Sequence, residues 1–261
     1  MKTLHFMYEM QIEYTIPVET CNYTIKCIPK DTKRQKIKIN KVELYPNTHY
    51  NEGVDGLLNK QIYGVNEASH NIFLYRIEGE AITGLEDYEE EENPDLDMIF
   101  KHPHGLNLSG DNIKQFFIKN NPEGIDNPVK KAVYLMNCLN RYMTYERYNT
   151  DVNKSAEEAF SLGKGVCQDY AHIFISLMHL AKIPSRYVTG LIMGEGESHA
   201  WVEILYDNKW IGIDPTNNTM VNDDYIKIGV GRDAKDCMIN RGIMHGGGYH
   251  TQSISVLVNE E

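Results

Sequence analysis

Cysteine, basic charge and long apolar runs are all scarce in this sequence. Its cysteines are odd in number and spread over 261 residues: Cys21, Cys27, Cys138, Cys167 and Cys237. Small secreted domains instead carry dense, even-numbered cysteines that form disulfides. No run approaches about 18 consecutive apolar residues, and Glu9 and Glu13 interrupt the segment where a signal peptide needs its apolar core. We therefore expect a cytoplasmic protein with reduced thiols and no membrane partner.

The shortage of basic residues excludes one class of partner. The sequence has 26 Lys and Arg against 37 Asp and Glu, which gives a net charge of −11. A non-specific grip on nucleic acid needs a clustered Lys/Arg surface, so we expect no nucleic-acid partner. The remaining composition, 41% hydrophobic and 24% charged residues, is ordinary for a globular protein that buries a core without disulfides. Composition does not define the oligomeric state.

The first third of the sequence has the period-two pattern of β-strands. Apolar and polar residues alternate, with turn residues between the runs, over residues 4–16, 23–28, 36–44 and 72–82. An acidic block with one proline, residues 86–95, follows and indicates either a domain linker or a solvated surface loop. We predict an N-terminal β-sandwich-like domain over residues 1–100 and a second domain over residues 101–261.

The second part of the sequence mixes helical and β patterns. Asn127-Pro128 is typical of a helix start, and Ser155–Glu158 is a capping box that opens another helix. A longer helix is predicted over residues 167–182. Strand-like runs follow at residues 186–193, 199–206, 209–214 and 251–258, the last after a glycine turn or bulge at residues 246–248. The chain as a whole is therefore predicted to be of the α+β class.

Cys167 is the cysteine whose position indicates chemistry. It stands at the predicted start of a helix, directly after Gly163-Lys164-Gly165-Val166. The N-terminus of a helix carries partial positive charge and free N–H groups, which favour a thiolate and can bind an oxyanion. The glycines allow a sharp turn that leaves the sulfur accessible. A cysteine can instead be a small buried hydrophobe, which is what we expect for Cys21, Cys27, Cys138 and Cys237.

His199 and Asp214 are predicted to meet across a β-hairpin. His199 begins one strand-like run, Asp214 ends the next, and Asp207-Asn208 between them is a candidate tight turn. With that turn, His199 and Asp214 lie one pairing step from direct opposition, within side-chain reach of each other. A carboxylate there would fix the tautomer of the imidazole and stabilise its imidazolium form. Each residue alone is an ordinary polar residue, but together with Cys167 they predict a nucleophilic site.

Four segments around these residues resemble the transglutaminase-like superfamily, and more closely its bacterial transglutaminase-like cysteine proteases. They are GVCQDYAH at 165–172, IPSRYV at 183–188, HAWVE at 199–203 and DPTN at 214–217. The resemblance implies a papain-like core in which helices pack on an antiparallel sheet. It also implies Cys167 as nucleophile, His199 as general base and acid, and Asp214 as orienting carboxylate. The sequence lacks an evident calcium loop, so we expect neither a cofactor nor a metal.

The expected reaction is attack of the Cys167 thiolate on an amide carbonyl of a peptide or protein. Transfer of the acyl group from the resulting thioester to water makes the enzyme a cysteine peptidase or amidase, which we favour, whereas transfer to an amine makes it a transglutaminase. The same residues are also compatible with a non-catalytic interaction module that retains the fold, and with an acyltransferase that uses a carrier thioester. Tyr145 is either a side-chain donor to the oxyanion or a core aromatic.

Histidine pairs elsewhere in the sequence lack the partners of a metal site. His102 and His104 alternate on an extended segment, and His172 and His179 share a helical face. Neither pair has cysteine or carboxylate partners at ligand spacing. We therefore interpret these histidines as structural or surface residues.

Overall fold

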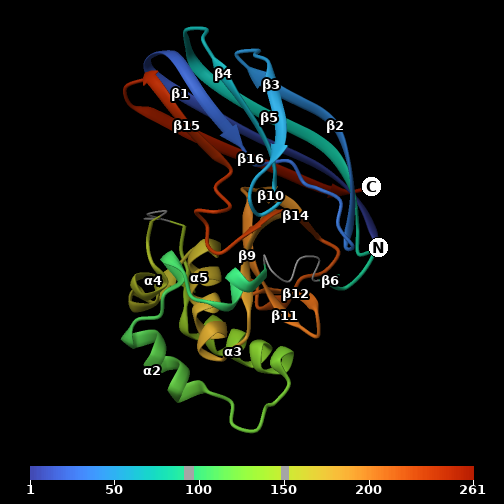
Figure 1. Ribbon diagram of the computed structural model, residues 1–261, viewed down its shortest axis with the longest axis vertical. Helices are drawn as coiled ribbons and strands as arrows, with labels where there is room; N and C mark the ends of the chain where they lie inside the picture. The colour runs from blue at the N-terminus through green and yellow to red at the C-terminus, as the bar shows by residue number, and fades with distance from the viewer. Residues whose placement is uncertain (91–96, 148–152) are drawn as a thin grey trace.

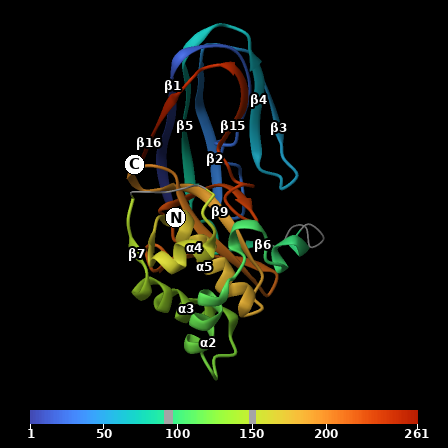
Figure 2. The same cartoon turned by 90° about the vertical axis from the view of Figure 1, so that its left-hand side faces the viewer.

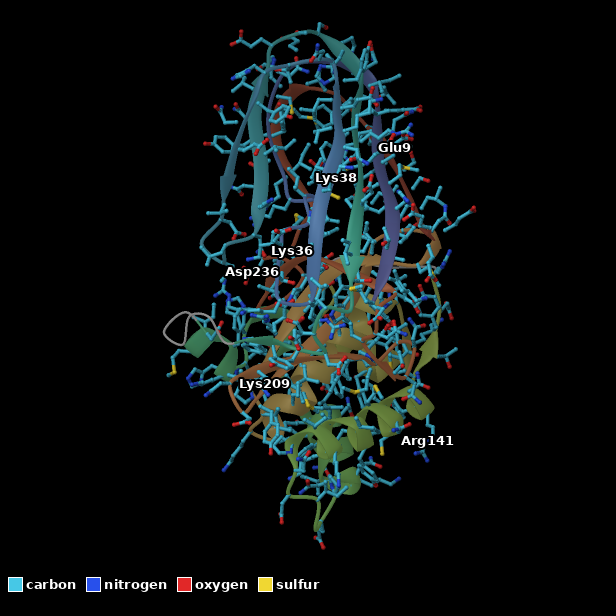
Figure 3. All side chains as sticks on the ribbon, turned by 90° about the vertical axis from the view of Figure 1, so that its right-hand side faces the viewer. Glu9, Lys36, Lys38, Arg141, Lys209 and Asp236 are labelled. Atoms are coloured by element: carbon cyan, nitrogen blue, oxygen red, sulfur yellow. The ribbon has the colours of Figure 1, made fainter. Side chains whose placement is uncertain are left out.

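The computed structural model describes residues 1–90, 97–147 and 153–261 and shows an elongated α+β molecule (Figure 1). Within these residues, an eight-stranded antiparallel sheet forms one end, and a six-stranded antiparallel sheet with its helices forms the other. Figure 2 shows the long strands of the first sheet rising away from the helical end. In Figure 3, Glu9 and Lys38 mark the first sheet and Arg141 marks the helical end. The predicted α+β class is confirmed.

The first sheet combines strands from both ends of the chain: β1 (Lys2–Ile25), β2 (Gln35–Tyr45), β3 (Tyr50–Val54), β4 (Lys60–Asn66), β5 (His70–Thr83), β10 (Gly194–Gly196), β15 (Asn240–Gly246) and β16 (His250–Glu260). β1 is one continuous strand where the sequence pattern indicates two runs. β16 and β15 pair with its successive halves on one side, and β5 and β4 on the other. The two halves of β1 meet near Pro17, whose carbonyl accepts a hydrogen bond from Gly247 N–H at 3.2 Å. Gly246–Gly248 all have positive φ and lead from the end of β15 to the start of β16, which agrees with the turn among the two predicted alternatives, turn or bulge.

The period-two pattern of β1 builds the core of the curled first sheet. Every second residue from Leu4 to Ile12 is buried, because successive side chains of a strand point to opposite faces. This core also contains Leu191 and Ile226 of the second sheet. The domain boundary near residue 100 stays a prediction, and residues 91–96 of the predicted linker lie outside the described residues.

The second sheet has the order β13-β12-β11-β9-β14, with β6 beside β12. Its strands are β6 (Glu89–Glu90), β9 (Ser185–Ile192), β11 (His199–Tyr206), β12 (Lys209–Asp214), β13 (Thr219–Met220) and β14 (Tyr225–Gly231). The hairpin between β11 and β12 turns at Asp207 and Asn208, both of which have positive φ. Val202 faces Ile213 across it. This is the register that the sequence predicts.

Helices cover one face of the second sheet (Figure 1). They are η1 (Met98–Lys101), η2 (Gly105–Asn107), α2 (Asp111–Asn120), α3 (Pro128–Tyr142), α4 (Ala156–Leu162) and α5 (Cys167–Leu180), with a short parallel pair, β7 (Thr144–Tyr145) and β8 (Lys164–Gly165). Asn127 caps α3, and Ser155 and Glu158 form the predicted capping box of α4. α5 packs against β9 and β11 and is buried from Asp169 to Met178. The α-helices in the described part of the chain are too short or too polar to cross a membrane.

A buried ion network lies on the face of the second sheet that points away from α5. Glu203 on β11 accepts from Arg186 Nη2 at 2.7 Å and from Lys227 Nζ at 3.0 Å. Lys227 also contacts Glu89 at 2.8 Å, so the acidic block contributes at least one residue to the interior. The Arg186 guanidinium stacks over the Trp210 ring at 4.1 Å. Because every charge in the network has a partner, the network joins four strands of the sheet without leaving an isolated buried charge.

Replacing Glu203 by glutamine should destabilise the fold by about 3 kcal/mol, because Arg186 and Lys227 would lose their shared counter-charge in a buried site. Burial alone raises the pKa of Glu203, but Lys227 and Arg186 lower it well below its ordinary value. A lowered folded-state pKa contributes stability above the unfolded value of about 4.3 and loses it as the pH falls below that value. Urea denaturation measures both effects. The control is Glu80→Gln, which removes a partly exposed partner of the exposed Lys38 (Lys38 is labelled in Figure 3) and should cost less than about 1 kcal/mol; equal losses would contradict the assignment.

Candidate active site

Cys167 is the first residue of α5 and follows a tight turn. Val166 N–H donates to Asp169 Oδ2 at 2.9 Å. A Cβ on Gly165 would meet that carboxylate oxygen at 2.5 Å, which explains the glycine. The first helical hydrogen bond runs from Tyr170 N–H to Val166 O at 3.1 Å. The N–H groups of Cys167 and of the next two residues therefore lie outside the helical ladder and point out of the helix start.

His199 and Asp214 lie side by side at one end of the second sheet. His199 Nε2 and Asp214 Oδ2 are 2.7 Å apart. His199 begins β11 and Asp214 ends β12, so the hairpin register that places Val202 opposite Ile213 also brings these two side chains together. The structure thus brings together the pair that the sequence predicts.

Asp214 is fully buried and has several further hydrogen-bond donors. Its Oδ1 accepts from the N–H groups of Thr216 and Asn217 at 2.9 and 3.2 Å. Its Oδ2 accepts from Asn217 Nδ2 and from the Tyr225 hydroxyl, both at 2.8 Å. Asn140 on α3 donates to the carbonyl of Thr216 at 3.1 Å and holds this loop against the helices. The carboxylate is therefore fixed in position by both the sheet and the loop that follows it.

The charges of these groups depend on one another. Burial alone lowers the pKa of His199, but the hydrogen bonds with Asp214 and with the Cys167 thiol raise it to about 10. Burial alone raises the pKa of Asp214, but the His199 contact and the Tyr225 hydroxyl lower it below its ordinary value. The imidazole is thus in contact with a thiol and a carboxylate together. This arrangement favours the imidazolium form of His199.

A cavity of about 460 Å³ opens over Cys167 and His199. Its walls include Tyr145, Arg147 and the segment from Gly194 to Ser198. The Cys167 side chain is partly exposed, so a substrate carbonyl in this cavity can reach the sulfur. Tyr145 lies in the cavity wall and is 46% exposed, which contradicts its interpretation as a core aromatic.

For three residues near the site, the sequence predicts no functional role. Tyr225 donates to Asp214 from β14, and Trp201 stacks near the His199 ring with 6.4 Å between centroids. Arg147 lines the same cavity as Cys167. β14 is not among the strands predicted from the sequence, and nothing in the sequence predicts that it lies beside β9.

Replacing Tyr225 by phenylalanine should lower kcat about tenfold and leave KM nearly unchanged. The ring stays in its contact with Trp201, at 5.4 Å between centroids, whereas Asp214 loses one donor. A hydrogen bond to a charged group is worth about 1.5 kcal/mol, or roughly tenfold in rate. Steady-state kinetics measures the split between kcat and KM. Tyr206→Phe, at the exposed end of β11, is the matched control; equal effects of both variants would contradict a positioning role for Tyr225.

The remaining candidate residues have structural surroundings. Cys21, Cys27 and Cys237 are buried, Cys138 is partly buried, and no cysteine forms a disulfide. His172 accepts from Ala234 N–H at 3.1 Å, and burial lowers its pKa to about 4. His179 contacts the Phe100 carbonyl. Among residues 1–90, 97–147 and 153–261, no group of three or more His, Cys, Asp or Glu side chains could hold a metal ion.

Comparison with known proteins gives the same family as the motifs. A sequence model of the transglutaminase-like superfamily matches residues 118–215. An uncharacterised protein of Mycobacterium leprae is 34% identical over 131 residues, which cover 46% of this chain and 47% of that protein. An uncharacterised protein of Mycobacterium tuberculosis is 30% identical over 118 residues, which cover 39% and 38% of the two chains. The chain thus spans less than half the length of these curated relatives.

A solved structure shows the same fold over nearly the whole chain. It is the crystal structure of a "putative cysteine protease" from Cytophaga hutchinsonii, with a TM-score of 0.83 and 18% identity over 99% of this chain and 90% of that one. At this identity, the likeness concerns the fold. The match over residues 118–215 shows that this part of the chain is a transglutaminase-like core.

Proposed function

We propose that this protein is a thiol-dependent acyl-transfer enzyme that attacks amide bonds. In this proposal Cys167 is the nucleophile, His199 the general base and acid, and Asp214 the orienting carboxylate. The observation that carries it is that the His199 ring lies between the Asp214 carboxylate and the Cys167 thiol. Asp214 holds Nε2 of the His199 ring at 2.7 Å, which leaves Nδ1 for the Cys167 thiol at the start of α5.

The raised pKa of His199 supports a charged resting pair. An imidazole with a pKa of about 10 stays protonated at neutral pH, and we propose that its positive charge stabilises a thiolate at Cys167. The positive end of α5 stabilises the same thiolate. A thiolate is the nucleophilic form of cysteine.

The proposed reaction has two halves. Sγ forms a bond to the carbonyl carbon, and the carbonyl oxygen becomes an oxyanion that binds the N–H end of α5, with the Tyr145 hydroxyl proposed as a side-chain donor. Collapse breaks the C–N bond while the His199 imidazolium protonates the leaving amine, and a thioester remains. His199 then deprotonates the acceptor, which attacks the thioester and releases the acyl group from Sγ.

We propose hydrolysis as the main reaction, which makes the protein a cysteine peptidase or amidase. The partly exposed thiol admits water without any acceptor site. A second candidate, transamidation, is favoured by Glu195 and Glu197, two exposed residues of the cavity wall whose carboxylates would attract a primary ammonium group. In either case the partner is a peptide or protein amide. We also propose a cytoplasmic location, which the five free cysteines fit.

Incubation with a peptide library, with and without a dansylated primary amine, tests this proposal. We expect cleaved or deamidated peptides by mass spectrometry, and few amine adducts. A majority of adducts would replace hydrolysis by transamidation. No product of either kind, at the level of the Cys167→Ala blank, would contradict the enzyme assignment for the peptides in the library.

A further inference from the structure

β10 is a short edge strand inside the connection between β9 and β11. It leaves the second sheet and pairs with β16 of the first sheet, with Glu195 opposite Leu257. Within the parts of the chain that the structure describes, no strand pairs with its other side. Figure 1 shows β10 at the junction of the two sheets. An edge strand presents a row of unpaired N–H and C=O groups to whatever lies beside it.

β10 is close to the reacting groups. All three residues of β10 line the cavity of about 460 Å³ that also contains Cys167 and His199, and His199 follows β10 after two residues. A second cavity of about 310 Å³ shares Gln168, Ser198 and two β9 residues with the first and continues toward β1 and β16. Together the two cavities provide room for a chain longer than a single amino acid.

The glycines of β10 leave space in front of its backbone. A Cβ added to Gly194 or Gly196 would meet nothing within 4 Å. At Gly194 the positive φ explains why the residue is glycine. At Gly196 neither a positive φ nor crowding by neighbouring atoms explains why the residue is glycine. Glycine weakens a strand and often marks a place where another backbone approaches closely. The open space at Gly196 lies on the cavity that contains Cys167.

We propose that β10 binds the main chain of an extended peptide as an added strand and so presents an amide of that peptide to Cys167. This inference rests on the proposed function and names its substrate class: extended peptide segments of about three or more residues, because such a segment spans about 10 Å and matches the length of β10. Strand addition gives affinity through main-chain hydrogen bonds and accepts many sequences. Small isolated amides are then poor substrates.

Alkylation of Cys167 by peptide reagents of increasing length tests the inference in the whole wild-type protein. The reagents are acetyl-Ala and acetyl-Ala-Ala-Ala chloromethyl ketones, chloroacetyl-Ala and chloroacetyl-Ala-Ala-Ala amides, and the three-residue forms with one N-methylated peptide bond. The chloromethyl ketones place the peptide on the N-terminal side of the reactive carbon and the chloroacetyl amides place it on the C-terminal side, so both directions over β10 are tested. Mass spectrometry follows Cys167 and, as an internal control, the partly buried Cys138.

In at least one direction, we expect the three-residue reagent to alkylate Cys167 about tenfold faster than the one-residue reagent. One N-methyl group in the three-residue reagent should lower this alkylation rate about tenfold. Cys138 should show no length dependence. Gly196→Val, which fills the open space, should remove the length dependence. Gly56→Val, at another glycine whose Cβ would meet nothing within 4 Å, should retain it.

The outcomes separate this inference from the proposed function. Fast reaction of Cys167 with iodoacetamide but equal rates for short and long reagents in both directions would overturn the β10 site alone. A Cys167 that reacts no faster than Cys138 with every reagent would overturn the proposed function, and the β10 site with it.

Discussion

The Cys167→Ala protein is expected to fold normally and to lose acyl transfer by a factor of about 10⁴ or more. Alanine removes only the sulfur from a position that is partly exposed at the start of α5, so the helix and its packing remain. The reaction loses the atom that forms the thioester, and the rest of the site cannot replace it. Initial rates on a peptide identified in the library experiment, together with circular dichroism, measure both parts of the expectation.

Cys138→Ala is the matched control for the loss of sulfur. Cys138 lies on α3, is also partly buried and is also free. Its replacement should leave the rate within about twofold, as expected for a position without contact to substrate. A Cys167→Ala protein that retains more than a tenth of the wild-type rate would show that another group performs the chemistry.

The Asp214→Asn protein should lose about 10³- to 10⁴-fold in kcat, because an amide at this position can favour the wrong tautomer of the imidazole. The hydrogen bond with the Asp214 carboxylate is also a main reason that the pKa of His199 is raised, so the variant should bring this pKa down toward its ordinary value. NMR titration of the His199 ring measures that shift independently of activity. An unchanged titration together with an unchanged kcat would contradict the role of Asp214.

The loop around Asp214 offers a control that keeps the carboxylate. Asn217→Ala removes one side-chain donor to Oδ2, but the His199, Tyr225 and backbone donors stay. Its effect should therefore be about tenfold or less, far below that of Asp214→Asn. Similar losses in both variants would indicate that the loop conformation matters more than the charge.

Local signals in the sequence predict much of the site. The two-residue turn at Asp207-Asn208 sets the hairpin register, and this register brings His199 to Asp214. The capping box at Ser155 and the turn before Cys167 also depend on neighbours within a few residues. Such features can be predicted because turns and caps are determined by short-range hydrogen bonds and backbone conformation.

The residues that the sequence does not predict come from distant parts of the chain. Tyr225 reaches Asp214 only because β14 lies beside β9. β10 closes the cavity only because β16, near the C-terminus, pairs with both β1 and β10. Strand order is a tertiary property, and no periodic pattern within β10 or β14 specifies it. The continuity of β1 through Pro17 likewise depends on its long partners on both sides.

The central claim is that His199 activates Cys167 as a thiolate, and the pH dependence of Cys167 alkylation tests it most directly. Iodoacetamide modification would be followed by mass spectrometry between about pH 5 and pH 9 in the wild type and in His199→Ala. We predict fast modification that persists well below pH 8 in the wild type and is lost in the variant. Slow modification with an ordinary thiol profile in both proteins would contradict the enzyme assignment and favour a non-catalytic binding module with the same fold.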